Sequence, residues 1–358
     1  MSTSDSDQLP YATAKGLRIL GKIRERAEDF EVREIAAYEP AGHGEHLLVH
    51  FEKTGLNTQD AVRRIARALD SDASQAGWAG LKDRQAVTTQ WASFFSADAG
   101  RARALELPGI RVLDARPHPH KLRTGHLRGN RFRIRIRGAA EGLETARAVL
   151  GELAAHGTPN YYGEQRFGRD AQNAPRARRW LAENGPAPRD RFERKLLASS
   201  LQASWFNTWL ADRVREGALG VARAGDLMRK EDSGGLFVTG DLADAEARVA
   251  SFSISPTGPM FGAKMRWPEA EALRIEQALW AREGLPDAAL ARWAKLLPGT
   301  RRVARMRPEQ VELRPVDQDL EVAFTLQKGA YATVVLRELL KSSAPQPVED
   351  ALEDEEAL

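Results

Sequence analysis

Apolar residues recur at two different spacings along the chain, and the change of spacing divides the chain into three parts. In the first third, dense apolar runs at 45–52 and 91–95 predict β-strands. Between them, apolar side chains fall on one face of a predicted helix, for which Thr58 is the expected cap: Val62, Ile65, Ala66 and Leu69. The first third is therefore expected to mix strands and helices.

The middle of the chain is more helical, and the end returns to strands. A helix is predicted over 192–214, where apolar and aromatic residues recur every four positions: Leu197, Leu201, Trp205 and Trp209. We interpret these aromatic side chains as core residues. Strands are predicted at 311–315 and 320–326, and a helix at 333–340. Strand-rich ends around a helical middle permit a discontinuous domain with an insertion.

Composition narrows the chemistry that is available to the 358 residues. Hydrophobic residues make up 42% of the chain, enough for a sizeable core, and cysteine is absent. The absence of cysteine excludes disulfides, thiol nucleophiles and zinc sites built on thiolates. No apolar run approaches the roughly 18 residues of a membrane span, and the start of the chain has no apolar signal core. We therefore expect a cytoplasmic protein that does not cross a membrane.

The formal net charge of +3 hides an uneven distribution. The segment 349–358 carries six acids and no base, so that the rest of the chain has a net charge of +9. Residues 1–12 and the acidic tail 342–358 are polar and are predicted to be disordered. A basic body of this kind favours a polyanionic partner such as nucleic acid.

The most basic stretch, 121–138, contains seven bases and no acid. Its second half alternates strictly between apolar and basic residues, which predicts a strand whose apolar side chains face inward. Four guanidinium groups would then share the outer face: Arg131, Arg133, Arg135 and Arg137. A solvated sheet face is one interpretation. Like charges at this spacing repel one another, however, so we favour contact with RNA phosphates.

Two further stretches contain residues suited to chemistry. The segment 77–90 (GWAGLKDRQAVTTQ) is a Gly-rich loop in which Lys82 and Arg84 flank Asp83, and their charge favours its ionised form. From residue types alone, an aspartate that caps a turn is the simpler interpretation. The segment 160–168 (NYYGEQRFG) fits equally well a packed turn or a loop that presents stacking groups to RNA.

Neither a metal site nor a cofactor site is expected. His46 and His50 would share a strand face, but no acceptable third ligand follows them. The turn at 42–44 leads into a strand rather than a helix, so it is not a dinucleotide loop. No other Gly-rich loop for a phosphate or a methyl donor is present.

The segments GLKDRQAVTTQ and NYYGEQRFG together resemble the tRNA pseudouridine synthase D family. Further matches follow along the chain in the family's order: AEDF at 27–30, GHGEH at 42–46, GNRF at 129–132 and GAYATVVLREL at 329–339. The resemblance implies an α/β fold of the α+β type, with a catalytic domain centred on an antiparallel sheet and a family-specific domain inserted in it. The implied limits are 13–156 with 306–341 for the catalytic domain, and 157–305 for the insertion.

The resemblance also implies the activity and the residues that perform it. The chain would be a cofactor-free isomerase, expected to be a monomer, that converts uridine 13 of tRNA to pseudouridine. The family's catalytic carboxylate falls on Asp83, and a basic residue that is commonly Lys falls on Arg24. The positions expected to contact the substrate are occupied by Phe30, Asn130 and Tyr331, the last of which is often Phe in the family.

Two other classes of protein remain open. A non-catalytic RNA-binding factor would need only the arginine strand, and the intact GLKDRQAVTTQ segment argues against it. Another RNA-modifying enzyme, such as a methyltransferase, would need the Gly-rich donor loop that this sequence lacks.

Overall fold

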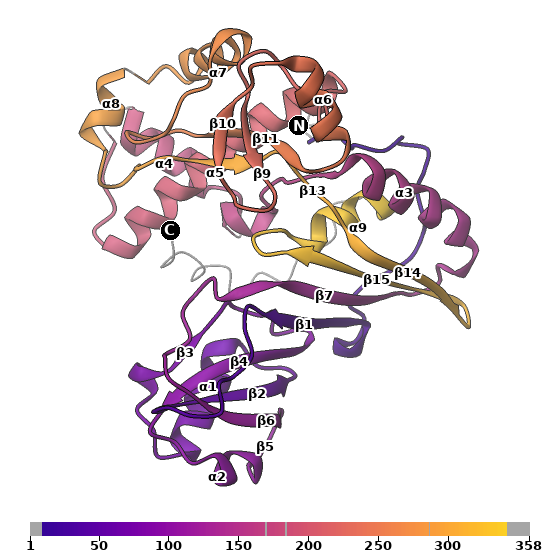
Figure 1. Cartoon of the computed structure of the whole chain (residues 1–358), viewed down its shortest axis with the longest axis vertical. Coiled ribbons are helices and arrows are strands. Elements are labelled where there is room, and N and C mark those ends of the chain that lie inside the picture. The colour runs from indigo at the N-terminus through magenta and orange to yellow at the C-terminus, as the bar shows by residue number, and fades with distance from the viewer. Residues whose placement is uncertain (1–8, 169, 183–184, 286, 342–358) are drawn as a thin grey trace. The chain divides into compact units, whose positions relative to one another are not determined.

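The computed structural model describes residues 9–168, 170–182, 185–285 and 287–341 (Figure 1). The predicted tail 342–358 and most of the predicted flexible N-terminus therefore lie outside the described residues. The chain divides into two compact units, each made of several segments. Among the described residues, unit 1 comprises 9–17, 149–307 (without 169, 183–184 and 286) and 333–341, and unit 2 comprises 18–148 and 308–332. One limit falls inside α3 (Leu143–His156) and another at the start of α9 (Ala332–Leu340).

Unit 2 is built on one large mixed sheet with strand order β14-β15-β7-β1-β4-β2-β6-β5, and β3 pairs with β4. All of its pairings are antiparallel except that between β1 and β4. Its strands are β1 (Phe30–Ala36), β2 (His46–Lys53), β3 (Gly77–Trp78), β4 (Val87–Phe95), β5 (Glu106–Leu107), β6 (Ile110–His118), β7 (Leu127–Ile136), β14 (Glu309–Val316) and β15 (Asp319–Gln327). The strands predicted in the first and last thirds are confirmed.

Two helices of unit 2, α1 (Thr58–Ala68) and α2 (Ala99–Arg103), pack on β2, β4 and β6. The apolar face predicted for α1 is buried against Phe51 and Phe94. Thr58, however, does not cap this helix. Asn57 does, because its side chain accepts the N–H of Asp60. The Thr58 hydroxyl is used elsewhere, as described below.

Unit 1 combines helices with a four-stranded sheet of order β10-β9-β11-β12 and a two-stranded sheet of β13 and β8. Its helices are α4 (Asn173–Ala182), α5 (Arg191–Arg215), α6 (Leu242–Ala250), α7 (Ala270–Arg282) and α8 (Asp287–Arg292). Its strands are β8 (Thr158–Pro159), β9 (Leu227–Lys230), β10 (Leu236–Val238), β11 (Ile254–Met260), β12 (Thr300–Val303) and β13 (Arg305–Met306). The predicted helix 192–214 is α5, and Trp205 and Trp209 are buried as expected.

Candidate active site

Asp83 lies in the loop between β3 and β4 of unit 2, and its carboxylate is held at both oxygens. Oδ2 is 2.9 Å from Nη2 of Arg24, and Oδ1 accepts the backbone N–H of Gln85 at 2.9 Å. The Asp83 side chain is 19% exposed and that of Arg24 only 8%. The carboxylate is thus held at both oxygens while part of its surface remains exposed to solvent.

Two hydrogen bonds hold the backbone of this loop in place, and a third ties Lys53 to the segment before α1. The ammonium group of Lys53, which is fully buried, donates to the carbonyl of Asp83 at 2.8 Å and to that of Leu56 at 2.6 Å. The N–H of Lys82 donates to the hydroxyl of Thr58 at 2.9 Å. Asp83 therefore sits on a backbone whose position is fixed from the core side of the loop.

A buried ion pair lies directly before Asp83. The Lys82 ammonium is 2.8 Å from Oε2 of Glu34, and the two side chains are only 5% and 1% exposed. Oε1 of Glu34 also accepts the N–H of Trp91 at 3.2 Å. We did not predict this pair from the sequence. A signal was present, because Glu34 follows Phe30 and Val32 at every second position and so falls on the buried face of β1.

Arg24 is held in an unusual conformation beside Asp83. Its φ of 61° is in the left-handed region, which costs a non-glycine residue about 1–2 kcal/mol. Its guanidinium carbon lies 4.3 Å from the centre of the Phe30 ring. Burial lowers the pKa of this guanidinium from its ordinary value, and the charge of Asp83 opposes the shift. Nε and Nη1 are buried without a hydrogen-bond partner among the described residues, and so remain available to an acceptor.

The other predicted substrate contacts are placed less directly. Phe30 is 3% exposed and packs edge to face with Phe132, so contact with a base through its covered face requires Arg24 to move. Asn130 lies directly across from Glu34 in the sheet, and its Oδ1 is buried without a partner among the described residues. Tyr331 is half-buried and follows β15, whose Leu326 pairs with Asn130. Direct contacts thus join Asp83, Arg24 and Phe30, while strand register places Asn130, and Tyr331 follows the strand that pairs with it.

The arginine strand is β7, and its predicted alternation is confirmed: Phe132, Ile134 and Ile136 are buried. By the same alternation Arg131, Arg133 and Arg135 lie on the opposite face from Asn130 and Phe132. Each of the four arginines predicted to contact phosphate has a carboxylate partner: Arg131 pairs with Glu312, Arg133 with Glu31, Arg135 with Asp319, and Arg137 with Asp29 and Asp319. These carboxylates offset the repulsion between the arginines, on which our argument for phosphate contact rested. Phosphate contact therefore stays a prediction.

The segment 160–168 belongs to unit 1 and is largely packed. Tyr161 and Tyr162 are buried, and the amide of Asn207 bonds both the N–H and the carbonyl of Tyr162 at 2.8 and 2.9 Å. The guanidinium of Arg302 covers the Tyr162 ring at 4.0 Å. Of the two interpretations left open, the packed turn describes these two tyrosines.

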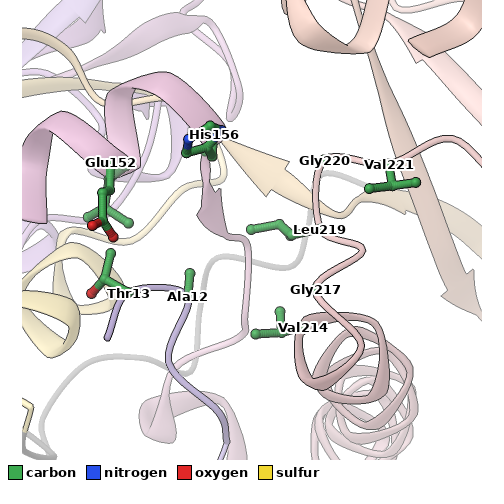
Figure 2. Close-up of a pocket in the computed structure, with 11 residues that line it drawn as sticks. Ala12, Thr13, Glu152, His156, Val214, Gly217, Leu219, Gly220 and Val221 are labelled. Atoms are coloured by element: carbon green, nitrogen blue, oxygen red, sulfur yellow. The ribbon is translucent and has the colours of Figure 1, made fainter. Parts of the chain in front are cut away.

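A separate pocket in unit 1 is lined by Glu152 and His156 of α3, by Thr13 and by Leu219 (Figure 2). None of the predicted site residues lines it. His46 and His50, weighed as ligands, pack instead against the rings of Phe95 and Trp91. In the described part of the chain, no three acidic or histidine side chains are grouped so as to hold a metal ion. Nor does that part contain a helix long and apolar enough to cross a membrane.

Comparison with known proteins decides the family. Over residues 8–182 and 191–339 the chain matches the family model described as tRNA pseudouridine synthase D (TruD). The chain belongs to the tRNA pseudouridine synthase D family. Proteins named tRNA pseudouridine synthase D from Anaeromyxobacter dehalogenans and Thermus thermophilus are 48% and 38% identical to it, over 348 and 355 residues. These alignments cover 96% and 98% of this chain and 99% and 98% of the relatives.

A solved structure shares the fold of this synthase D family member. The crystal structure of a putative tRNA pseudouridine synthase D from Methanosarcina mazei matches it with a TM-score of 0.72 and 22% sequence identity. The match covers 94% of this chain and 96% of the other. The predicted α/β fold class is confirmed, with the correction that the central sheet has one parallel pairing.

Proposed function

We propose that this chain is a tRNA pseudouridine synthase that isomerises uridine 13, with Asp83 as its catalytic carboxylate. The observation that carries the proposal is the Asp83–Arg24 contact of 2.9 Å on an anchored loop, in a chain of the synthase D family. The proposal includes a cofactor-free reaction by a monomer in the cytoplasm, and these parts remain predictions.

The reaction breaks the bond from ribose C1′ to N1 of uracil, rotates the base and forms a bond from C1′ to C5. A carboxylate can drive it by attacking C1′ or C6, or by taking a proton on a glycal route. Each route needs an ionised carboxylate at a fixed position. Arg24 supplies the fixed position, since its guanidinium holds Oδ2 of Asp83 at 2.9 Å.

The surroundings of Asp83 suit a nucleotide that has left its stack. The unused donors of Arg24, Nε and Nη1, can bond ribose or uracil oxygens next to the carboxylate. The Asn130 amide can read the polar edge of uracil, and Tyr331 can stack on the base. Phe30 supports the guanidinium of Arg24 in the free protein.

The test is to incubate the protein with an unmodified tRNA transcript, without cofactor, and to map pseudouridines chemically. The proposal expects one pseudouridine, at position 13, and none in a matched transcript with cytidine at that position. A pseudouridine elsewhere would refute the assigned site. Tight tRNA binding with no product would favour a non-catalytic RNA-binding factor.

A further inference from the structure

The start of α5 presents an exposed cationic surface in unit 1. Within seven residues the chain places Arg189, Arg191 and Lys195 around Phe192, and all four side chains are exposed. We call these four residues the α5 basic surface. Phe192 is 46% exposed, and Phe95 at 45% is the other aromatic residue among the large exposed apolar side chains of the described chain.

Helical spacing gathers three of these side chains on one side of α5. Arg191 and Phe192 stand four and three residues before Lys195, so they share a helical face. The opposite side of the helix is buried through Leu197 and Leu201. The basic side chains and the ring therefore project together into solvent.

The acids next to this surface are already engaged. Asp190 caps α5 by accepting the N–H of Glu193 at 3.0 Å, and Glu193 itself pairs with Arg176. Within the described residues, Arg189, Arg191 and Lys195 have no carboxylate at ion-pair distance. Arg131, Arg133, Arg135 and Arg137 differ in this respect, because each of them already has a carboxylate partner. A phosphate can bind the α5 cations without first breaking an ion pair.

We infer that the α5 basic surface binds tRNA, with the three cations on phosphates and Phe192 stacked on an unpaired base. Cations that surround a solvent-exposed ring are the usual composition of contacts to single-stranded nucleic acid. This inference rests on the proposed function and extends it, since it assigns a second tRNA contact in unit 1 to a protein whose candidate chemistry lies in unit 2.

The first test measures the salt dependence of the affinity for an unmodified tRNA transcript. In Arg191→Ala/Lys195→Ala, the slope of log affinity against log salt flattens by about 1.4–1.8, which corresponds to two lost phosphate contacts. The matched control is Arg63→Ala/Arg67→Ala, an exposed pair with the same spacing on α1. An unchanged slope, or one that changes equally in the control, overturns the inference.

The second test removes the ring. Phe192→Ala weakens tRNA binding on the order of tenfold, the effect expected when one stacked base loses its platform. Phe95→Ala, which removes an equally exposed ring from unit 2, leaves the affinity unchanged. Equal effects of the two substitutions contradict a specific role for Phe192.

Activity separates this inference from the proposed function. If the wild-type protein is active, we expect the α5 variants to raise KM for tRNA and to leave kcat at saturating tRNA unchanged. The binding assays need no turnover, so they test the surface even if no pseudouridine forms. If the wild-type protein is active and the α5 variants bind tRNA as tightly as it does, the inference about the α5 basic surface is refuted and the proposed function is not.

Discussion

Replacing Lys82 by Met tests the ion pair behind Asp83. The substitution keeps the length of the side chain but removes the ammonium group that faces Glu34 at 2.8 Å. Glu34 is 1% exposed and keeps only its bond from the Trp91 N–H. Its carboxylate would then be buried without an ionic partner. Breaking such a pair from one side costs about 3–5 kcal/mol, because the desolvation of the remaining charge is no longer offset.

The size of this effect distinguishes a buried charge from lost packing. We expect Lys82→Met to lower the free energy of unfolding by about 3–5 kcal/mol in urea denaturation at pH 7. The double variant Lys82→Met/Glu34→Gln should recover part of the loss, since the amide is neutral and can still accept the Trp91 N–H. A single variant within about 1 kcal/mol of wild type, or a double variant less stable than the single one, would refute the reasoning.

Three further changes probe the site and its sheet. Gly129→Ala should destabilise the protein by about 1–3 kcal/mol in the same assay, because its Cβ would stand 2.2 Å from the carbonyl oxygen of Leu326; wild-type stability would contradict this. Arg24→Met should lower single-turnover rates about ten- to a hundredfold, because it removes a charge-assisted bond to Asp83. Arg24→Lys keeps the charge and should keep most of the rate. Equal rates in the two variants would show that the charge of Arg24 does not account for the effect. Arg133→Ala/Arg135→Ala tests phosphate contact by β7: a salt slope flatter by roughly one unit per lost contact supports it, and an unchanged slope leaves these arginines as ion-paired sheet residues.

Periodic patterns predicted part of this fold: the helices α1, α5 and α9 and the strands β2, β4, β7, β14 and β15. The four-residue spacing of α5 and the alternation of β7 each report which side chains are buried, and both predictions hold in the structure. The cap of α1 was assigned one residue too late, because Asn57 and Thr58 can both accept an N–H at a helix start. The structure distinguishes them, because the Thr58 hydroxyl accepts the N–H of Lys82 from the neighbouring loop.

Contacts between distant segments could not be predicted in the same way. The partners of the β7 arginines come from segments around residues 29–31 and 312–319, and their positions depend on strand register that the sequence pattern does not reveal. Arg24, which contacts Asp83, adopts a left-handed backbone conformation that its residue type does not favour. The family resemblance named both residues, and the structure supplied their geometry.

The most direct test of the central claim is a single-turnover assay of Asp83→Asn on a tRNA transcript with uridine at position 13. Asn is nearly isosteric and can still accept the Gln85 N–H, but it cannot act as an anion. Asp70→Asn, which alters an exposed aspartate paired with Arg101, is the matched control. We expect no pseudouridine from Asp83→Asn, with tRNA affinity and cooperative unfolding retained, and full activity from the control. Turnover near the wild-type rate in folded Asp83→Asn would contradict the account.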